Sequence, residues 1–203
     1  MVLLKDKNGK TEAEFLREYD VTEYFRPSVT VDAALYRVKD GKLSVLMIQR
    51  GGHPYIGKYA FAGGFVERDE SCEAAVLREL REETGVTDVA LRQLVTVSTP
   101  DRDPRWRNIT VVFCGGAPSG VTITAGDDAA AARWFDVDYS EDGTLRMDGG
   151  DIKFTCKLTV ARDAFGRIDL NNTVITERGE TAFDHAKVVC YLAEALKRGE
   201  LCE

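Results

Sequence analysis

Residues 63–86 read GGFVERDESCEAAVLRELREETGV and join two glycines to a stretch with helical periodicity. Ser71 or Asp69 can cap the start of this helix by accepting a hydrogen bond from a free backbone N–H group. Gly85 stands where a helix commonly ends in the left-handed conformation. About fourteen residues between these signals are therefore expected to be helical, and they carry more carboxylates than a surface helix needs.

An advance of about 100° per residue sorts this helix into faces. One side, which we expect to pack on a sheet, carries Val76, Leu77 and Leu80. Another side combines three glutamates with small residues that leave room for a substrate: Glu79, Glu82, Glu83, Cys72 and Ala75. The glutamates are spaced i, i+3, i+4, so they repel one another unless a cation neutralises them. Oxygen ligands alone favour Mg²⁺, Mn²⁺ or Ca²⁺ over zinc.

The same carboxylates have a simpler interpretation, a solvated acidic face that pairs with Arg78 and Arg81 and binds nothing. The whole stretch decides between the two. From Gly64 it runs through five residues to Glu70 and through seven more to the segment RELREETGV at 78–86. This spacing resembles the Nudix box, G-x5-E-x7-R-E-U-x-E-E-x-G-U, in which U is apolar, and every fixed position is matched.

Resemblance to the Nudix family implies an α/β fold, an α/β/α sandwich around a mixed β-sheet. It also implies metal ligation, to Mg²⁺ or Mn²⁺, by three box glutamates and one backbone carbonyl: Glu79, Glu82, Glu83 and Gly64. Glu70 would fix Arg78 by an ion pair, and Arg78 and the three glutamates would form the catalytic set. The family uses different general bases, and Glu79, Asp127 and Asp128 are the candidates here.

Composition limits the compartment and the partners. The chain has 203 residues, 27 basic and 34 acidic, and its net charge of −7 argues against a broad surface for nucleic acid. Five scattered cysteines without a CxxC pair indicate reduced thiols, and no apolar run suits an export signal or a membrane span. We therefore expect a cytoplasmic protein that binds neither nucleic acid nor membrane.

The chain outside the box divides into an N-terminal arm, residues 1–20, and one domain, residues 21–203. Residues 11–20 are expected to form a short helix capped by Thr11, which packs on the domain or a second subunit or is a loosely docked terminus. Apolar runs at 28–38 and 43–50 are separated by an Asp-Gly pair, which predicts a hairpin covered on both faces.

Further elements follow the box. Residues 89–99 and 108–116 are expected to be partner strands, and the acidic, Gly-rich stretch 139–151 a loop. An added hairpin is expected within 153–178, followed by a C-terminal helix capped by Thr181. His185, at the start of this helix, is expected to be a packed, hydrogen-bonded residue and not a ligand.

The loop at 100–107, PDRDPRWR, has two interpretations. Arginine presents a planar fork suited to phosphate and tryptophan a face suited to a nucleobase, so the loop can face the substrate or a second subunit. It can also be a self-paired turn, in which Asp101 and Asp103 neutralise its arginines. We favour the first and predict four substrate-binding residues: Arg50, Arg102, Arg105 and Trp106.

Both this loop and the FDHAK segment at 183–187 resemble the ADP-ribose pyrophosphatase-like branch, which includes Nudix regulators of NAD metabolism. Those regulators continue into a winged helix-turn-helix, whereas here only four residues follow Gly199. The resemblance implies hydrolysis of a nucleoside diphosphate linked to another moiety, first of all ADP-ribose to AMP and ribose 5-phosphate, in a homodimer. The alternatives are a pyrophosphatase for modified nucleoside triphosphates and a non-catalytic ADP-ribose-binding regulator.

Overall fold

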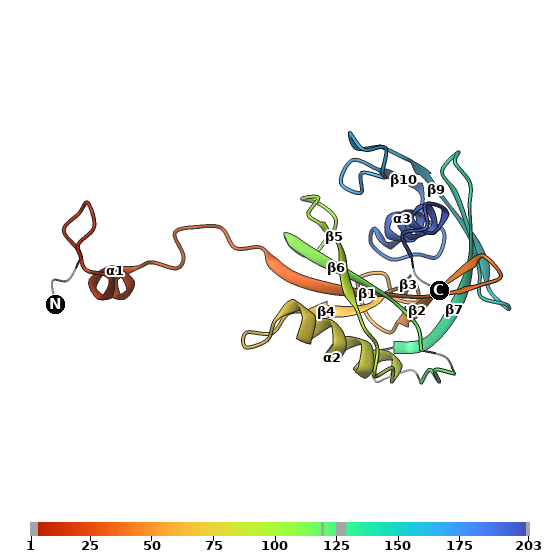
Figure 1. Cartoon of the computed structure of the whole chain (residues 1–203), viewed down its shortest axis with the longest axis horizontal. Coiled ribbons are helices and arrows are strands. Elements are labelled where there is room, and N and C mark those ends of the chain that lie inside the picture. Colours follow the sequence, from red (N-terminus) through yellow and green to blue (C-terminus); the bar gives the residue numbers. More distant parts are fainter. Residues whose placement is uncertain (1–3, 119, 125–128, 202–203) are drawn as a thin grey trace.

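A mixed sheet of 10 strands forms the centre of the computed structural model, which describes residues 4–118, 120–124 and 129–201 (Figure 1). The strand order is β10-β9-β8-β7-β2-β1-β6-β5, with β3 on β2 and β4 on β1. The pairing of β1 with β6 is parallel, and the other pairings are antiparallel. The strands are β1 (Ser28–Lys39), β2 (Lys42–Arg50), β3 (Tyr59–Ala60), β4 (Ala62–Phe65), β5 (Arg92–Val97), β6 (Asn108–Gly116), β7 (Ala129–Tyr139), β8 (Thr144–Asp148), β9 (Lys153–Thr159) and β10 (Val174–Glu177).

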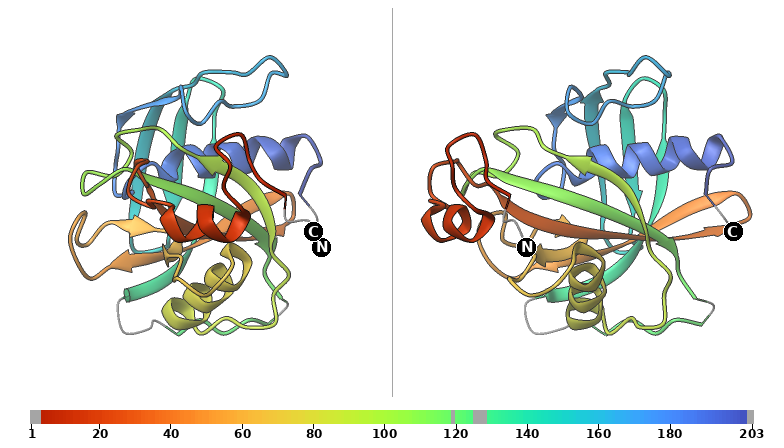
Figure 2. Two further views of the ribbon diagram at one scale, coloured as in Figure 1. Left: turned by 90° about the vertical axis from the view of Figure 1, so that its left-hand side faces the viewer. Right: turned by 60° about the vertical axis from the view of Figure 1, so that its left-hand side comes forward.

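Two helices cover opposite faces of this sheet, which confirms the predicted α/β/α sandwich (Figures 1 and 2). Helix α2 (Cys72–Thr84) packs on one face with side chains such as Val31 and Leu35 of β1. Helix α3 (His185–Lys197) packs on the other face among residues of β2 and β7. None of the helices in the described segments has the length and apolar character that a bilayer crossing requires.

The hairpin between β1 and β2 forms as predicted. Lys39 pairs with Lys42 across a two-residue turn, in which Asp40 and Gly41 both have positive φ, as a turn of this hand needs. β1 is buried without interruption from Val31 to Tyr36, because a helix or loop covers each face.

The caps of α2 lie at the predicted places. Ser71, and not Asp69, accepts a hydrogen bond from the Ala74 N–H at 3.2 Å, and Gly85 ends the helix with φ 69°. The predicted apolar stripe is wrong at Leu77, which is 44% exposed. Ala75 is fully buried, so the stripe is rotated toward this residue.

The predicted loop at 139–151 is wrong, because β8 lies inside it. Leu145 and Met147 are buried while Arg146 between them is exposed, an alternation with the period of a strand. The acidic and Gly-rich flanks of this short strand concealed the pattern. The predicted hairpin that follows is confirmed as β9 and β10, which pair in antiparallel fashion.

The last helix begins later than predicted. Asp184, and not Thr181, is its N-cap residue, and the Asp184 side chain makes no capping hydrogen bond. The Thr181 hydroxyl donates to the carbonyl of Arg178, and the Asp184 carboxylate is held by Arg102. At Asp184, local capping is thus replaced by a contact with a distant part of the chain.

Helix α1 (Glu12–Glu18) is short and stands away from the sheet at the end of an extended segment (Figure 1). The Thr11 side chain and Glu14 form a reciprocal capping box, as the predicted cap requires. The helix has no buried residue. What this N-terminal arm packs on stays a prediction.

Candidate active site

A cavity of about 340 Å³ lies where β1, β4 and α2 meet the 100–107 loop and the start of α3. Seven of the predicted site residues line it: Arg50, Gly64, Arg78, Glu79, Glu83, Arg102 and Arg105. Glu82 and Trp106 do not. The folded chain therefore brings most of the box and two further segments, each carrying arginine, to one place.

The two glycines allow the close approach of three elements. β4 pairs with β1 so that Gly63 lies opposite Asp32. A Cβ on Gly63 would stand 2.1 Å from the carbonyl oxygen of Val31, and a Cβ on Gly64 would stand 2.3 Å from Oε1 of Glu79. The missing Cβ of Gly63 thus allows the close approach of β1 in the sheet, and the missing Cβ of Gly64 allows the approach of Glu79 on α2.

Arg78 is the centre of the charged group on α2. Its guanidinium donates to both oxygens of Glu70 at 2.6 and 3.1 Å, which is the ion pair that the family resemblance implies. The same guanidinium donates to Glu79 at 2.8 Å and to Glu82 at 3.2 Å. These carboxylates raise the pKa of Arg78 well above its usual value, so the arginine stays charged and neutralises part of the acidic face.

Glu83 is the most enclosed glutamate of the box. It accepts a hydrogen bond from the backbone N–H of Gly63 at 2.9 Å, which holds its carboxylate inside the cavity. Burial, and in second place the charge of Glu79, raises the pKa of Glu83 to about 7. Glu82, by contrast, has a side chain that is 50% exposed at the rim.

The chemistry of these residues fits a divalent cation of the Mg²⁺ type. All donors are oxygens, and Glu79 lies against Gly64 in the cavity that Glu83 enters. In the described part of the chain, no three acidic, histidine or cysteine side chains converge as a metal cluster, and Arg78 donates hydrogen bonds to both Glu79 and Glu82. Arg78 therefore neutralises part of the charge of Glu79 and Glu82.

Arg50 and Arg102 both line the cavity but differ in their partners. Arg50 donates to the carbonyl of Pro54 at 2.8 Å and forms no ion pair with any described residue. Burial and the nearby charge of Arg105 lower the pKa of Arg50. Arg102 is bound through two nitrogens to Asp184 at 2.7 and 2.9 Å, and both side chains are less than 10% exposed. Of these two arginines, Arg50 is thus the one whose charge is open to an anion.

Arg105 and Trp106 lie in the same loop. Arg105 pairs with Asp103 at 2.8 and 3.0 Å, as in the self-paired interpretation, but its guanidinium also lies over the rings of Phe65 and Phe183 in the cavity. Trp106 is 59% exposed and contacts the ring of Phe25, with centroids 5.8 Å apart. The loop therefore places two arginines, Arg102 and Arg105, at the cavity and its tryptophan at the surface.

Several cavity residues were not predicted as site residues, among them Asp32, Phe183 and His185. A lone aspartate in the apolar run of β1 was a usable signal, since a buried carboxylate needs partners. His185 is a packed, hydrogen-bonded residue, as predicted. Of the candidate general bases, Glu79 lines the cavity, while Asp127 and Asp128 lie outside the described residues.

Comparison with known proteins agrees with this geometry. The profile of the NUDIX domain matches residues 26–157. The chain is 43% identical over 114 residues to an ADP-ribose pyrophosphatase of Methanocaldococcus jannaschii, covering 56% of this chain and 64% of that one. It is 37% identical over 108 residues to the ADPR responsive transcriptional repressor NtrR of Acinetobacter baylyi, covering 52% and 43%. The chain thus spans less than two thirds of these curated relatives.

Solved structures show the same relationship. A MutT/nudix family protein from Enterococcus faecalis superposes with a TM-score of 0.73 at 33% identity, over 93% of this chain and 70% of that one. The NUDIX domain of Shewanella oneidensis NrtR, solved with ADP ribose, superposes with a TM-score of 0.56 at 36% identity, over 62% and 82%. Since the family profile covers more than half of the sequence and the box residues gather in one cavity, this chain belongs to the Nudix family.

Proposed function

We propose that this protein hydrolyses a nucleoside diphosphate linked to another moiety, with ADP-ribose as the substrate and AMP and ribose 5-phosphate as products. One observation carries the proposal: a single cavity combines two box carboxylates, Glu79 and Glu83, with arginines from outside the box, among them Arg50 and Arg105. Carboxylates that hold a cation and arginines that bind phosphate are what cleavage of a diphosphate needs. The identity to an ADP-ribose pyrophosphatase over 114 residues supports the choice of substrate.

Glu79, Glu82 and Glu83, with the carbonyl of Gly64, would hold Mg²⁺ or Mn²⁺, and the bound ion would neutralise diphosphate oxygens and lower the pKa of the attacking water. Glu83 is already placed by the Gly63 N–H. Arg78, which Glu70 holds in place at the cavity wall, balances part of the charge of the carboxylates.

Arg50 and Arg105 bind the diphosphate in this proposal. Their guanidiniums lie 5.0 and 5.7 Å from the centre of the Phe183 ring, so two like charges face one cavity. A phosphate group relieves that repulsion and accepts hydrogen bonds from both. Arg102 supports the site through Asp184, and Trp106 offers its ring to a nucleobase or to a second subunit.

The competing function is hydrolysis of a modified nucleoside triphosphate. With Mg²⁺ present, we expect kcat/KM for ADP-ribose to exceed that for oxidised dGTP by at least about 10²-fold, because the identity to an ADP-ribose pyrophosphatase favours ADP-ribose. Product analysis by chromatography measures both reactions. Faster cleavage of oxidised dGTP would contradict ADP-ribose as the substrate and favour a pyrophosphatase for modified nucleoside triphosphates. Tight binding of ADP-ribose without any turnover would favour a non-catalytic ADP-ribose-binding regulator.

We also propose that two copies pair through the N-terminal arm, in the cytoplasm. Large apolar side chains are exposed on the arm, on the segment 21–27 that follows it and on the 100–107 loop: Phe15, Leu16, Tyr19, Val21, Tyr24, Phe25 and Trp106. Such a concentration of exposed aromatic residues is typical of interfaces. The four described cysteines are free thiols, as in a reducing compartment.

Light scattering at micromolar concentration is expected to give the mass of a dimer for the wild-type chain and of a monomer for the double variant Phe15→Glu and Leu16→Glu. Burial of two charged side chains in an apolar interface is strongly unfavourable. Glu12→Gln, an exposed change on the same helix, is the matched control and is expected to remain dimeric. A wild-type chain that has the mass of a monomer at micromolar concentration would contradict the proposed dimer.

A further inference from the structure

His185 lines the cavity but is only 3% exposed. Its Nδ1 accepts a hydrogen bond from the backbone N–H of Phe61 at 2.8 Å, and its ring stacks on the Phe61 ring with centroids 5.3 Å apart. Burial lowers the pKa of His185, so the ring is neutral. Because Nδ1 accepts, the single ring proton must be on Nε2.

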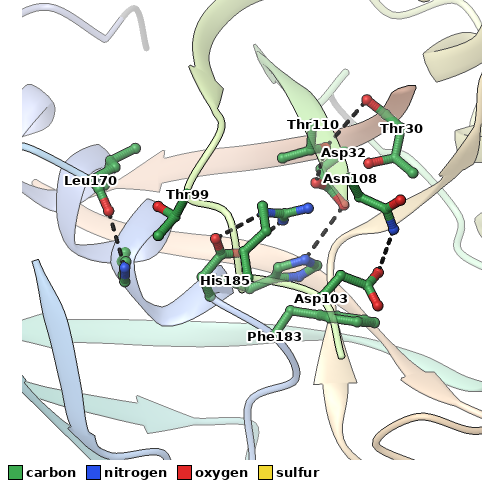
Figure 3. A network of polar contacts seen from close by, with 12 residues as sticks. Thr30, Asp32, Thr99, Asp103, Asn108, Thr110, Leu170, Phe183 and His185 are labelled. Atoms are coloured by element: carbon green, nitrogen blue, oxygen red, sulfur yellow. Dashed lines mark hydrogen bonds and ion pairs between the residues drawn. The ribbon is translucent and has the colours of Figure 1, made fainter. Parts of the chain in front are cut away.

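This Nε2 points at Asp32, whose Oδ1 is 3.5 Å away (Figure 3). The other oxygen of Asp32 accepts a hydrogen bond from the hydroxyl of Thr110 at 2.5 Å. Asp32 is 8% exposed and stands opposite Gly63 in the pairing of β1 with β4. The 3.5 Å separation is longer than a usual N–H···O hydrogen bond, so Asp32 acts on the protonated Nε2 side of the ring by electrostatic attraction and close packing.

The segment Phe61–Gly64 is consequently held from both faces of the sheet. His185, on α3, binds the N–H of Phe61, and Glu83, on α2, binds the N–H of Gly63 at 2.9 Å. Only Ala62 separates these two contacts, and Gly64 follows them directly. The start of α3 is itself anchored, because Asp184 is bound to Arg102 of the 100–107 loop.

We propose that Asp32 and His185 form a positioning pair that holds the segment Phe61–Gly64, and through it sets the place of the Gly64 carbonyl and of the Glu83 carboxylate. Neither residue is a catalytic residue in this account, because both nitrogens of His185 are directed at protein groups. The expected effect on kcat rests on the proposed function, whereas the expected effect on the backbone of Phe61–Gly64 is independent of it.

Three substitutions separate the two contacts of His185. Asparagine places an amide oxygen near the Nδ1 position and can still accept from Phe61, whereas glutamine places its amide near Nε2 and can reach only toward Asp32. Phenylalanine keeps the packing and removes both contacts. His53→Asn is the matched control, since the other histidine of the chain is exposed.

With ADP-ribose and Mg²⁺, His185→Phe is expected to lower kcat by about 10–100-fold, the usual cost of losing an outer positioning contact, with little change in KM. His185→Asn is expected to recover most of kcat, and His185→Gln little of it. Amide hydrogen exchange at Phe61 and Gly63 should be faster in the phenylalanine variant and near wild type in the asparagine variant, while His53→Asn changes nothing.

Equal kcat in the asparagine and phenylalanine variants, or unchanged exchange at Phe61 and Gly63, would overturn the positioning role. If the wild-type chain hydrolyses no diphosphate, the proposed function fails but the exchange measurement still decides the inference. Should His185→Phe not fold, the comparison of the asparagine and glutamine variants carries the test. Higher kcat in the asparagine variant supports the positioning role of the contact with Phe61, and equal kcat in the two variants contradicts it.

Discussion

Replacing Glu83 by glutamine is expected to lower kcat for diphosphate hydrolysis by on the order of 10²–10³-fold, the usual cost of removing one preorganised charge from an active site. The amide nearly preserves the volume of the side chain, so the cavity keeps its shape. It loses the negative charge that a divalent cation requires. Because the Gly63 N–H can still donate to the amide oxygen, the free energy of unfolding should change little.

Glu73→Gln is the matched control for this variant, because Glu73 lies on the same helix but is exposed in its first turn. We expect it to retain wild-type kcat. Rates are measured at saturating Mg²⁺ and substrate, and folding by thermal unfolding. Near-normal turnover by the Glu83 variant would remove this residue from the metal site.

Alanine at the two box glycines is expected to have different effects. At Gly63 the added Cβ would stand 2.1 Å from a backbone oxygen of β1, which cannot move without disturbing the sheet. We expect Gly63→Ala to lower the free energy of unfolding by about 3 kcal/mol, the upper end of the range for overpacking. At Gly64 the Cβ meets the end of the flexible Glu79 side chain. Gly64→Ala should therefore fold and lose about 10²-fold in kcat through displacement of that carboxylate.

Urea unfolding and turnover, measured on both variants, separate these effects. Gly52→Ala is the control, because a Cβ there has no neighbour within 4 Å. It should match wild type in both measurements. A stable Gly63→Ala variant, or a fully active Gly64→Ala variant, would contradict the close contacts described above.

The parts of the fold that sequence could predict are those set by local signals. Ser71 and Gly85 bound the box helix because capping depends on residues within one turn. The Asp40-Gly41 turn follows from the positive φ that both positions need. Strand β8 was missed because its five residues stand between Gly-rich and acidic stretches that signal a loop.

The candidate site was predictable where the box defines it and less so elsewhere. Glu79 and Glu83 share one helix face and one cavity, as their spacing requires. Arg102 was assigned to substrate, but its carboxylate partner, Asp184, is 82 positions away in the chain and no local pattern links them. The contact of His185 with Phe61, 124 positions apart, arises in the same way from the packing of α3 on the sheet.

The central claim, hydrolysis of ADP-ribose, is tested most directly by incubating ADP-ribose with the purified chain and Mg²⁺, with and without EDTA, and recording phosphorus NMR spectra. We expect the diphosphate resonances to be replaced by two phosphomonoester resonances, those of AMP and ribose 5-phosphate, and we expect EDTA to stop this change. Diphosphate resonances that persist with either Mg²⁺ or Mn²⁺, although the ligand binds, would contradict it and show a binding protein in place of a hydrolase.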